Sequence, residues 1–206
     1  MRTIFLTLFI SLFFIQVTKA QSGFVIGVRG ITPSVNFLDS KYSSVGVNLG
    51  YGKTFLKGHM GADLTAFADF LSYKNDLRKL DATTFYTGLA LNPWYCFNSE
   101  NEGVLLSVSM AIKGGINQGW GVVTQSNLSD QDKQIENKAV HAGFAVNAAA
   151  AVNLTFPINV GSIGFSLGYD TTNFGKGINK LRPTYYSPLN YSSSGIFLGI
   201  SFRLGH

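Results

Sequence analysis

The chain has 206 residues, of which 46% are hydrophobic and only 13% are charged, a balance poorer in charge than that of an ordinary soluble protein. Its formal charge is +5, but Arg2 and Lys19 supply two of these charges, so the rest of the chain carries +3, which is too little to indicate a nucleic-acid partner. The single cysteine, Cys96, excludes an internal disulfide, and we expect it to be a packed thiol.

The first twenty residues predict a secretory signal peptide. Arg2 precedes an apolar stretch from Ile4 to Ile15, and Ala20 is a small residue at the expected cleavage point. A retained anchor helix is the alternative, but a core of about a dozen apolar residues is short for a membrane span. We therefore assign residues 1–20 to a signal peptide and residues 21–206 to one domain.

No later segment approaches the roughly 20 apolar residues of a spanning helix, and apolar residues instead alternate with small or polar ones. From Ser44 to Lys53, for example, valine, leucine and tyrosine alternate with glycine and asparagine. The same period of two predicts eight strands, at residues 23–31, 44–54, 59–71, 83–96, 103–113, 138–155, 160–171 and 191–204. We keep Ala148 to Ala151 as strand, although alanine favours a helix by propensity, because the alternation continues on both sides.

The predicted fold class is all-β, an eight-stranded antiparallel up-and-down transmembrane barrel. An even number of strands places both termini on one side, and closure leaves no strand edge unpaired in lipid. The connections also alternate, with short turns at 55–58, 97–102 and 156–159 and longer polar segments at 32–43, 72–82, 114–137 and 172–190. Short turns are expected to face the periplasm and long loops the outside.

A soluble barrel is the alternative to a membrane barrel. Several predicted strands, however, reach or exceed the roughly 9 to 11 residues that cross a bilayer at a tilt, and soluble strands average about five or six. Aromatic residues also gather near the strand ends, which predicts two interfacial belts. These residues are Tyr51, Phe55, Trp94, Tyr95, Phe97 and Phe156 on the periplasmic side, with Phe70, Phe85, Tyr169 and Tyr191 on the outer side.

Together, the signal peptide, the eight alternating strands and the closing strand from Ser194 to Leu204 resemble the small outer-membrane β-barrel proteins of the OmpA/OmpX-like class, particularly the porin-like barrel families of Bacteroidota. The resemblance covers Gly23 to the C-terminus. It implies residence in a bacterial outer membrane, contact with outer-membrane lipid and lipopolysaccharide, and insertion by the barrel-insertion machinery. One departure is that Phe202 is followed by four further residues, whereas the insertion signal of such proteins usually ends on an aromatic residue.

The sequence contains no phosphate-binding loop, dinucleotide fingerprint, paired-cysteine metal motif or GxSxG elbow, so no catalytic residue, cofactor or metal is expected. Membrane-barrel enzymes use dispersed residues, which makes His141 the one catalytic alternative, because the alternation places it on the inner face of the sixth strand. A lone histidine inside a lumen is more commonly a hydrogen-bonded filler than a general base.

Charged residues on the inner faces predict a network in the lumen. Its members are Arg29, Asp63, Asp69, Lys113, His141 and Asp170. Mutual pairing is the simpler interpretation, and a selectivity filter would require a lumen wide enough for water. Arg29 is predicted to pair with Asp63, with Asp69 or Asp170 as alternates, because Arg29 and Asp63 lie at similar counts from the periplasmic ends.

The fourth long loop is rich in basic and tyrosine residues and is a candidate interaction surface. Its residues are Lys176, Lys180, Arg182, Tyr185 and Tyr186. Docking of lipopolysaccharide phosphates or of a protein is the functional interpretation, and a solvated loop is the simpler one. The leading hypothesis is therefore a non-enzymatic structural or surface-interaction barrel whose external ligand is unknown; the alternatives are a narrow diffusion channel or transport accessory and a lipid-modifying enzyme centred on His141.

Overall fold

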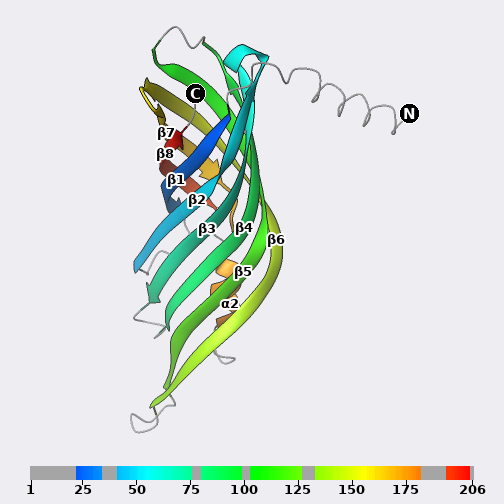
Figure 1. Cartoon of the computed structure of the whole chain (residues 1–206). Coiled ribbons are helices and arrows are strands. Elements are labelled where there is room, and N and C mark those ends of the chain that lie inside the picture. The colour runs from blue at the N-terminus through cyan, green and yellow to red at the C-terminus, as the bar shows by residue number, and fades with distance from the viewer. Residues whose placement is uncertain are drawn as a thin grey trace, which may run out of the picture.

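The computed structural model describes residues 22–33, 41–75, 80–98, 103–126, 133–181 and 194–204, which form one closed barrel (Figure 1). The strands are β1 (Ser22–Pro33), β2 (Lys41–Phe55), β3 (Met60–Asn75), β4 (Leu80–Cys96), β5 (Leu105–Ser126), β6 (Lys133–Ile158), β7 (Gly161–Asp170) and β8 (Gly195–Leu204). Each strand pairs antiparallel with its neighbours in sequence, and β1 pairs with β8 to close the ring. This arrangement confirms the predicted fold class.

Two short helices accompany the strands: η2 (Leu56–Gly58) in the turn after β2, and α2 (Gly175–Leu181) in the connection between β7 and β8. In the part of the chain that the structure describes, no helix is long and apolar enough to cross a membrane. The predicted signal peptide, residues 1–20, lies outside the described residues.

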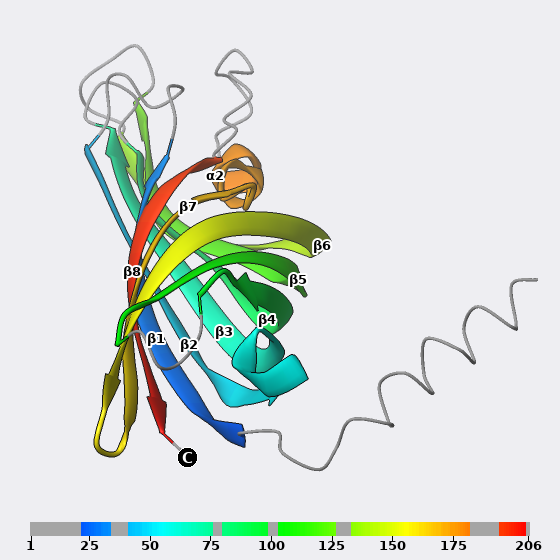
Figure 2. The same cartoon turned by 90° about the horizontal axis from the view of Figure 1, so that it is seen from above.

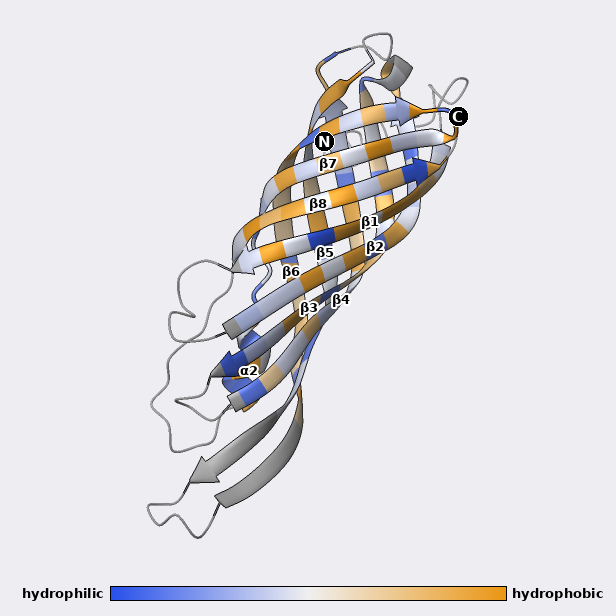
Figure 3. Ribbon diagram, turned by 90° about the vertical axis from the view of Figure 1, so that its left-hand side faces the viewer, coloured by the Kyte–Doolittle hydropathy of each residue, from blue (hydrophilic) through white to orange (hydrophobic). Residues whose placement is uncertain are grey.

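The apolar side of each strand faces outward, and the small or polar side faces the lumen. On β2, Val45, Val47 and Leu49 are exposed, while Gly46 and Gly52 are buried. Figure 3 shows the same alternation of hydrophobic and polar residues along the barrel wall. This pattern is the inverse of a soluble barrel and matches a protein surrounded by lipid. Within β6, Ala149 is buried between exposed Ala148 and Ala150, so the alanine run is a strand, as predicted.

Strands β5 and β6 project well beyond the rest of the barrel (Figure 1), and Figure 2 shows α2 beside the end of β7 and the start of β8. Strands β5 and β6 contain 22 and 26 residues, whereas β7 and β8 contain 10 each. The predicted long loop at 114–137 was therefore wrong, because β5 and β6 stay paired as far as Ser126 and Lys133. The predicted loop at 72–82 was also wrong for most of its length, since β3 and β4 pair as far as Asn75 and Leu80.

The segment 114–137 was predicted as a loop because it is long and polar, but its glycines lie within β5. Gly115 instead faces inward and packs so closely on β4 that an added Cβ would overlap the carbonyl group of Thr87. Small residues at inward positions allow strands and the helix inside the barrel to approach one another. Glycine in this segment therefore marks close packing and not the end of a strand.

A β-bulge in β6 changes the direction of the side chains beyond it. Asn117 lies opposite Gly143, but the next residue, Gln118, lies opposite His141, so Ala142 is an extra residue. Gly143 has a φ of 87°, a left-handed conformation that glycine adopts without strain. Because one inserted residue reverses the in–out alternation, His141 is exposed on the outer surface. Its predicted place on the inner face was wrong.

We predict that the folded protein is heat-modifiable. A closed ring of hydrogen-bonded strands resists detergent until it is heated, so the unboiled protein should migrate differently from the boiled protein in a detergent gel. Far-ultraviolet circular dichroism of the unboiled sample should show mostly β structure. Identical migration before and after boiling, together with a helical spectrum, would contradict the fold.

Candidate functional site

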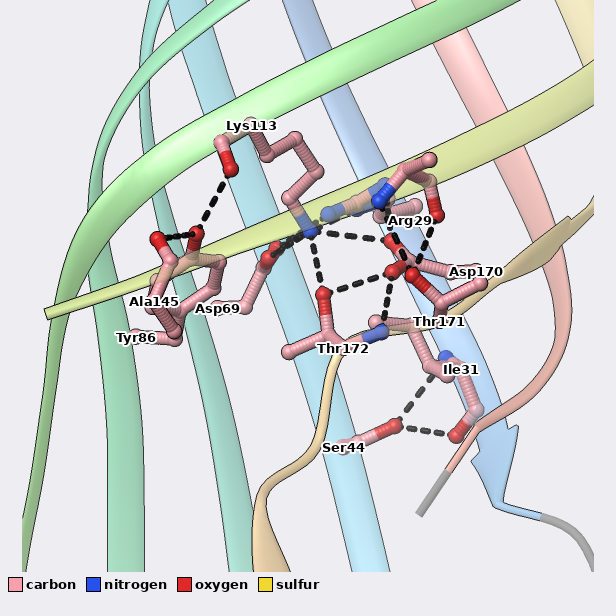
Figure 4. A network of polar contacts seen from close by, with 11 residues as sticks. Arg29, Ile31, Ser44, Asp69, Tyr86, Lys113, Ala145, Asp170, Thr171 and Thr172 are labelled. Carbon is pink, nitrogen blue, oxygen red and sulfur yellow. Dashed lines mark hydrogen bonds and ion pairs between the residues drawn. The ribbon is translucent and has the colours of Figure 1, made fainter. Parts of the chain in front are cut away.

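The centre of the lumen holds four charged side chains from four strands, here called the central cluster: Arg29 on β1, Asp69 on β3, Lys113 on β5 and Asp170 on β7 (Figure 4). Every second strand contributes one member, and each occupies an inward position of the alternation. The two cations and two carboxylates give the cluster a formal charge of zero.

Arg29 is held by both carboxylates. Its Nη2 lies 2.6 Å from Asp69 Oδ2 and 2.8 Å from Asp69 Oδ1, and its Nη1 lies 2.9 Å from Asp170 Oδ2. Gly46 lies between Arg29 and Asp69 on the neighbouring strand, and a Cβ at that position would overlap both side chains. The missing side chain at Gly46 therefore makes room for this ion pair.

Lys113 is the more deeply enclosed of the two cations, with 2% of its side chain exposed against 16% for Arg29. Its Nζ donates to Asp69 Oδ2 at 2.7 Å, to Asp170 Oδ2 at 2.9 Å and to Thr172 Oγ1 at 2.8 Å. These three bonds use all the donors of the ammonium group. A buried charge is costly unless it is paired and hydrogen-bonded, and Lys113 satisfies both conditions.

Aromatic rings surround the two cations. Lys113 Nζ lies 4.9 Å from the ring centroid of Phe67 and 5.3 Å from that of Tyr86, and Arg29 Cζ lies 5.4 Å from that of Phe197. The Tyr86 hydroxyl also lies within hydrogen-bond distance of two backbone carbonyl oxygens, those of Lys113 and Ala145. The cluster and these rings thus lie together at one level of the lumen.

On the outer side of the central cluster, the lumen is occupied by α2 and the residues just before it. Phe174, Ile178 and Leu181 are buried in the same apolar core as Leu71 and Tyr86 from the barrel wall. The helix packs on β4, β5 and β6, and Gly177 lies against Gly119 of β5 and Thr84 of β4. The connection between β7 and β8, predicted as a wholly external loop at 172–190, therefore enters the barrel mouth.

On the side of the central cluster toward the short turns, which we expect to face the periplasm, the lumen contains a cavity of about 450 Å³. Its wall consists mainly of glycine, alanine and small polar residues, so side chains do not fill the space. The wall residues that carry hydroxyl or amide groups include Asn48, Thr65, Asn92, Ser107, Ser109, Asn153, Ser166 and Ser201. Lys113, Arg29 and Phe67 line the cavity at its outer end, where it meets the central cluster.

A second ion pair lies beside this cavity. Arg203 Nη2 donates to Asp63 Oδ1 at 2.6 Å, and the Arg203 guanidinium lies 5.6 Å from the ring centroid of Trp94. The predicted pairing of Arg29 with Asp63 was wrong, because Arg29 pairs with the two alternates. Trp94 lines the lumen, so its predicted place in the outward-facing periplasmic belt was also wrong.

The structure thus brings together four of the six residues predicted for the lumen network. Asp63 belongs to the separate pair with Arg203, and His141 lies on the outer surface. Sequence analysis missed Arg203 and Thr172 as polar partners. Arg203 could have been found, because it alternates with the outward-facing Ile200, Leu198 and Ile196 and so occupies an inward position.

Lys176 and Lys180, from the predicted interaction surface, are exposed on α2. Lys180 Nζ donates to the backbone carbonyl oxygen of His141 at 2.8 Å, which ties α2 to β6 beyond the bulge. Arg182, Tyr185 and Tyr186 lie outside the described residues.

Cys96 is buried at the periplasmic end of β4, and its Sγ lies 3.3 Å from the carbonyl oxygen of Asn98. Burial and this local contact agree with the expected packed thiol.

No protein-family model and no curated protein sequence matches the chain. Among solved structures, it is similar to Ail, the attachment invasion locus protein of Yersinia pestis, with a TM-score of 0.51 and 16% identity over 90% of this chain and 99% of that chain. Neisserial surface protein A matches with a TM-score of 0.48 and 9% identity over 91% and 97% of the two chains. The likeness to Ail shows the fold, which is that of the small eight-stranded outer-membrane barrels. The narrower resemblance to Bacteroidota families stays a prediction.

We predict that the four members of the central cluster are energetically coupled. Lys113→Met should lower the free energy of unfolding by about 3 to 5 kcal/mol, because it leaves two buried carboxylates with one cation. A variant in which apolar residues replace all four members should lose less than the sum of the four single losses.

Urea unfolding of the protein in detergent or lipid measures the free energy of unfolding of each single variant and of the fourfold variant. The pair Arg29→Ala and Asp63→Ala is the matched control, since these residues do not meet and their losses should add. Additive losses within the central cluster would contradict the geometry.

Proposed function

We propose that this chain is a non-enzymatic outer-membrane barrel that anchors and displays an external interaction surface. The observation that carries the proposal is that the lumen is occupied at two levels: the paired central cluster lies in its middle, and α2 packs inside one mouth. Among the described residues, the projecting β5–β6 hairpin and α2 are then the parts that we expect to contact external molecules. The band of exposed apolar residues around the barrel supports a position in lipid.

The proposal includes a cleaved signal peptide at residues 1–20, export through the inner membrane and insertion by the barrel-insertion machinery. The basis is the sequence of the first twenty residues and the small outer-membrane barrel fold. Outer-membrane lipid and lipopolysaccharide would surround the outward apolar face. In this proposal, the exposed Lys176 and Lys180 of α2 contact the phosphate groups of lipopolysaccharide.

The structure offers little support to the two alternatives. A diffusion channel needs a continuous path, but the cavity of about 450 Å³ meets the central cluster at its outer end. An enzyme centred on His141 needs that residue in an enclosed lumen, but the bulge turns it to the outer surface. Mass spectrometry of lipid A from cells with and without the protein should accordingly show the same acyl pattern.

We predict that the purified barrel conducts no steady current in planar lipid bilayers, because paired charges and packed rings fill the lumen at the central cluster. A porin reconstituted in the same lipid serves as the positive control. Steady conductance steps from the wild-type barrel would reject the sealed lumen and favour the channel.

We also predict that the β5–β6 hairpin lies outside the cell. An epitope inserted within residues 127–132 should bind antibody on intact cells, whereas the same epitope inserted at Asn159–Val160, in the short turn between β6 and β7, should bind only after the outer membrane is permeabilised. The reverse pattern would invert the orientation of the barrel.

A further inference from the structure

The polar cavity that adjoins the central cluster has the size of a small-molecule binding site. Its volume of about 450 Å³ falls within the range of roughly 300 to 1,000 Å³ that such sites occupy. The cavity is not fully enclosed, and its lining reaches Thr54, Gly58 and Ile158, at the end of the barrel where the short turns lie. We therefore expect small solutes to enter from that end.

The charged groups that line this cavity are mainly cationic. Among the described residues, three cations and one carboxylate belong to the lining: Arg29, Lys113, Arg203 and Asp63. The side chains of Asp69 and Asp170, which pair with the first two cations, are 0% exposed and do not line the cavity. In the second ion pair the cation is again the more exposed partner, with 25% of the Arg203 side chain exposed against 8% for Asp63. A solute in the cavity therefore meets an excess of positive charge, which favours an anion.

Two buried hydrogen-bond donors in this wall have no partner. Arg203 donates through Nη2 to Asp63 Oδ1 at 2.6 Å, but its Nη1 has no hydrogen-bond partner in the described part of the chain, and Trp94 Nε1 has none either. The two side chains are neighbours, because the Arg203 guanidinium lies 5.6 Å from the ring centroid of Trp94. A buried donor without a partner lowers stability, and an oxyanion held beside both groups would supply the missing acceptors.

The rest of the polar wall suits hydroxyl groups. Side chains that carry an amide or a hydroxyl line the cavity from β2, β4, β5 and β8, and they include Asn48, Asn92, Ser107 and Ser201. Serine hydroxyls and asparagine amides both donate and accept hydrogen bonds, so they can bind a ligand hydroxyl whichever way its proton points. The wall thus matches a solute that combines a negative group with several hydroxyls.

We propose that this cavity binds a small organic anion that carries several hydroxyl groups, of the class of the sugar acids and sugar phosphates. Its carboxylate or phosphate contacts the Arg203 guanidinium and the Trp94 indole N–H, and its hydroxyls contact the serine and asparagine side chains of the wall. This inference goes beyond the proposed function, because the site lies on the opposite side of the central cluster from α2 and does not involve the external surface.

The two tryptophans of the chain provide a site-specific probe and its control. Trp94 lines the cavity, whereas Trp120 on β5 is 52% exposed. The protein in micelles of an uncharged detergent at low salt is titrated with gluconate or glucose 6-phosphate, and with glucose as the neutral control of similar size. The indole N–H signal of Trp94, assigned with Trp94→Phe, should shift saturably in NMR spectra at millimolar anion, while that of Trp120 does not move.

The comparison between the two anions identifies the charged group, since the anion that saturates the shift at the lower concentration carries the preferred group. Glucose at the same concentrations should leave both indole signals unchanged. The proposal is overturned if neither anion shifts the Trp94 signal at millimolar concentration, or if glucose shifts it as strongly as the anions do.

Three charge variants test the contact with Arg203. Arg203→Gln should bind the anion about tenfold more weakly, as expected for the loss of a charge-assisted hydrogen bond. Asp63→Asn should bind the anion at least as tightly as the wild type, because the competing carboxylate is removed while the guanidinium remains. Lys74→Gln removes the same charge at the opposite end of β3 and is the matched control, with unchanged affinity.

A merely structural role of the pair of Arg203 and Asp63 would weaken binding in both variants of that pair, and such a result would overturn the proposal. Wild-type affinity in Arg203→Gln would overturn it as well. Heat-modifiable migration of each variant in a detergent gel verifies that it is folded.

Discussion

The pairing between β1 and β8 is the constraint on which the rest of the structure depends, because lipid offers backbone groups no hydrogen-bond partner. Eight strands form a narrow ring, so closure also limits what can lie inside. Bulky apolar residues face outward, and the inward positions carry small residues or charges that neutralise one another. Gly46 on β2 shows how small inward residues make room for paired charges. Because Gly46 has no side chain, Arg29 and Asp69 on the two flanking strands can meet in the lumen.

The lumen has three levels with different chemistry, and their order determines what the barrel can do. A polar cavity lies toward the periplasm, the central cluster lies in the middle, and the apolar residues of α2 lie toward the outside. Lys113 lies between two carboxylates, and each carboxylate contacts both cations, so each charge of the middle level has two opposite partners. Such mutual pairing holds the four side chains together at the end of the cavity that Arg29 and Lys113 line.

The alternation of residue types was sufficient to predict the number of strands, the closed barrel and the inward direction of Arg29, Asp69, Lys113 and Asp170. It was not sufficient to predict which charges pair. Neighbouring strands in a barrel are shifted along one another, so two residues at the same number of positions from the strand ends do not lie opposite each other. Arg29 is paired across the sheet with Gly46, and Gly46 is paired with Asp69, so Arg29 meets Asp69 and not Asp63. The shift between neighbouring strands is a property of the closed ring, and the sequence of a single strand does not indicate it.

The β6 bulge is the second feature that alternation could not predict. One inserted residue exchanges the inward and outward directions of all side chains beyond it. Beyond the bulge His141 faces outward, and Val140 faces inward to pack against the apolar core that includes Leu181 of α2. The same insertion therefore seats the helix in the barrel mouth and directs the backbone of His141 toward Lys180. Because α2 packs inside the barrel instead of extending β7, the described strands leave the side of β6 beyond Ala148 unpaired.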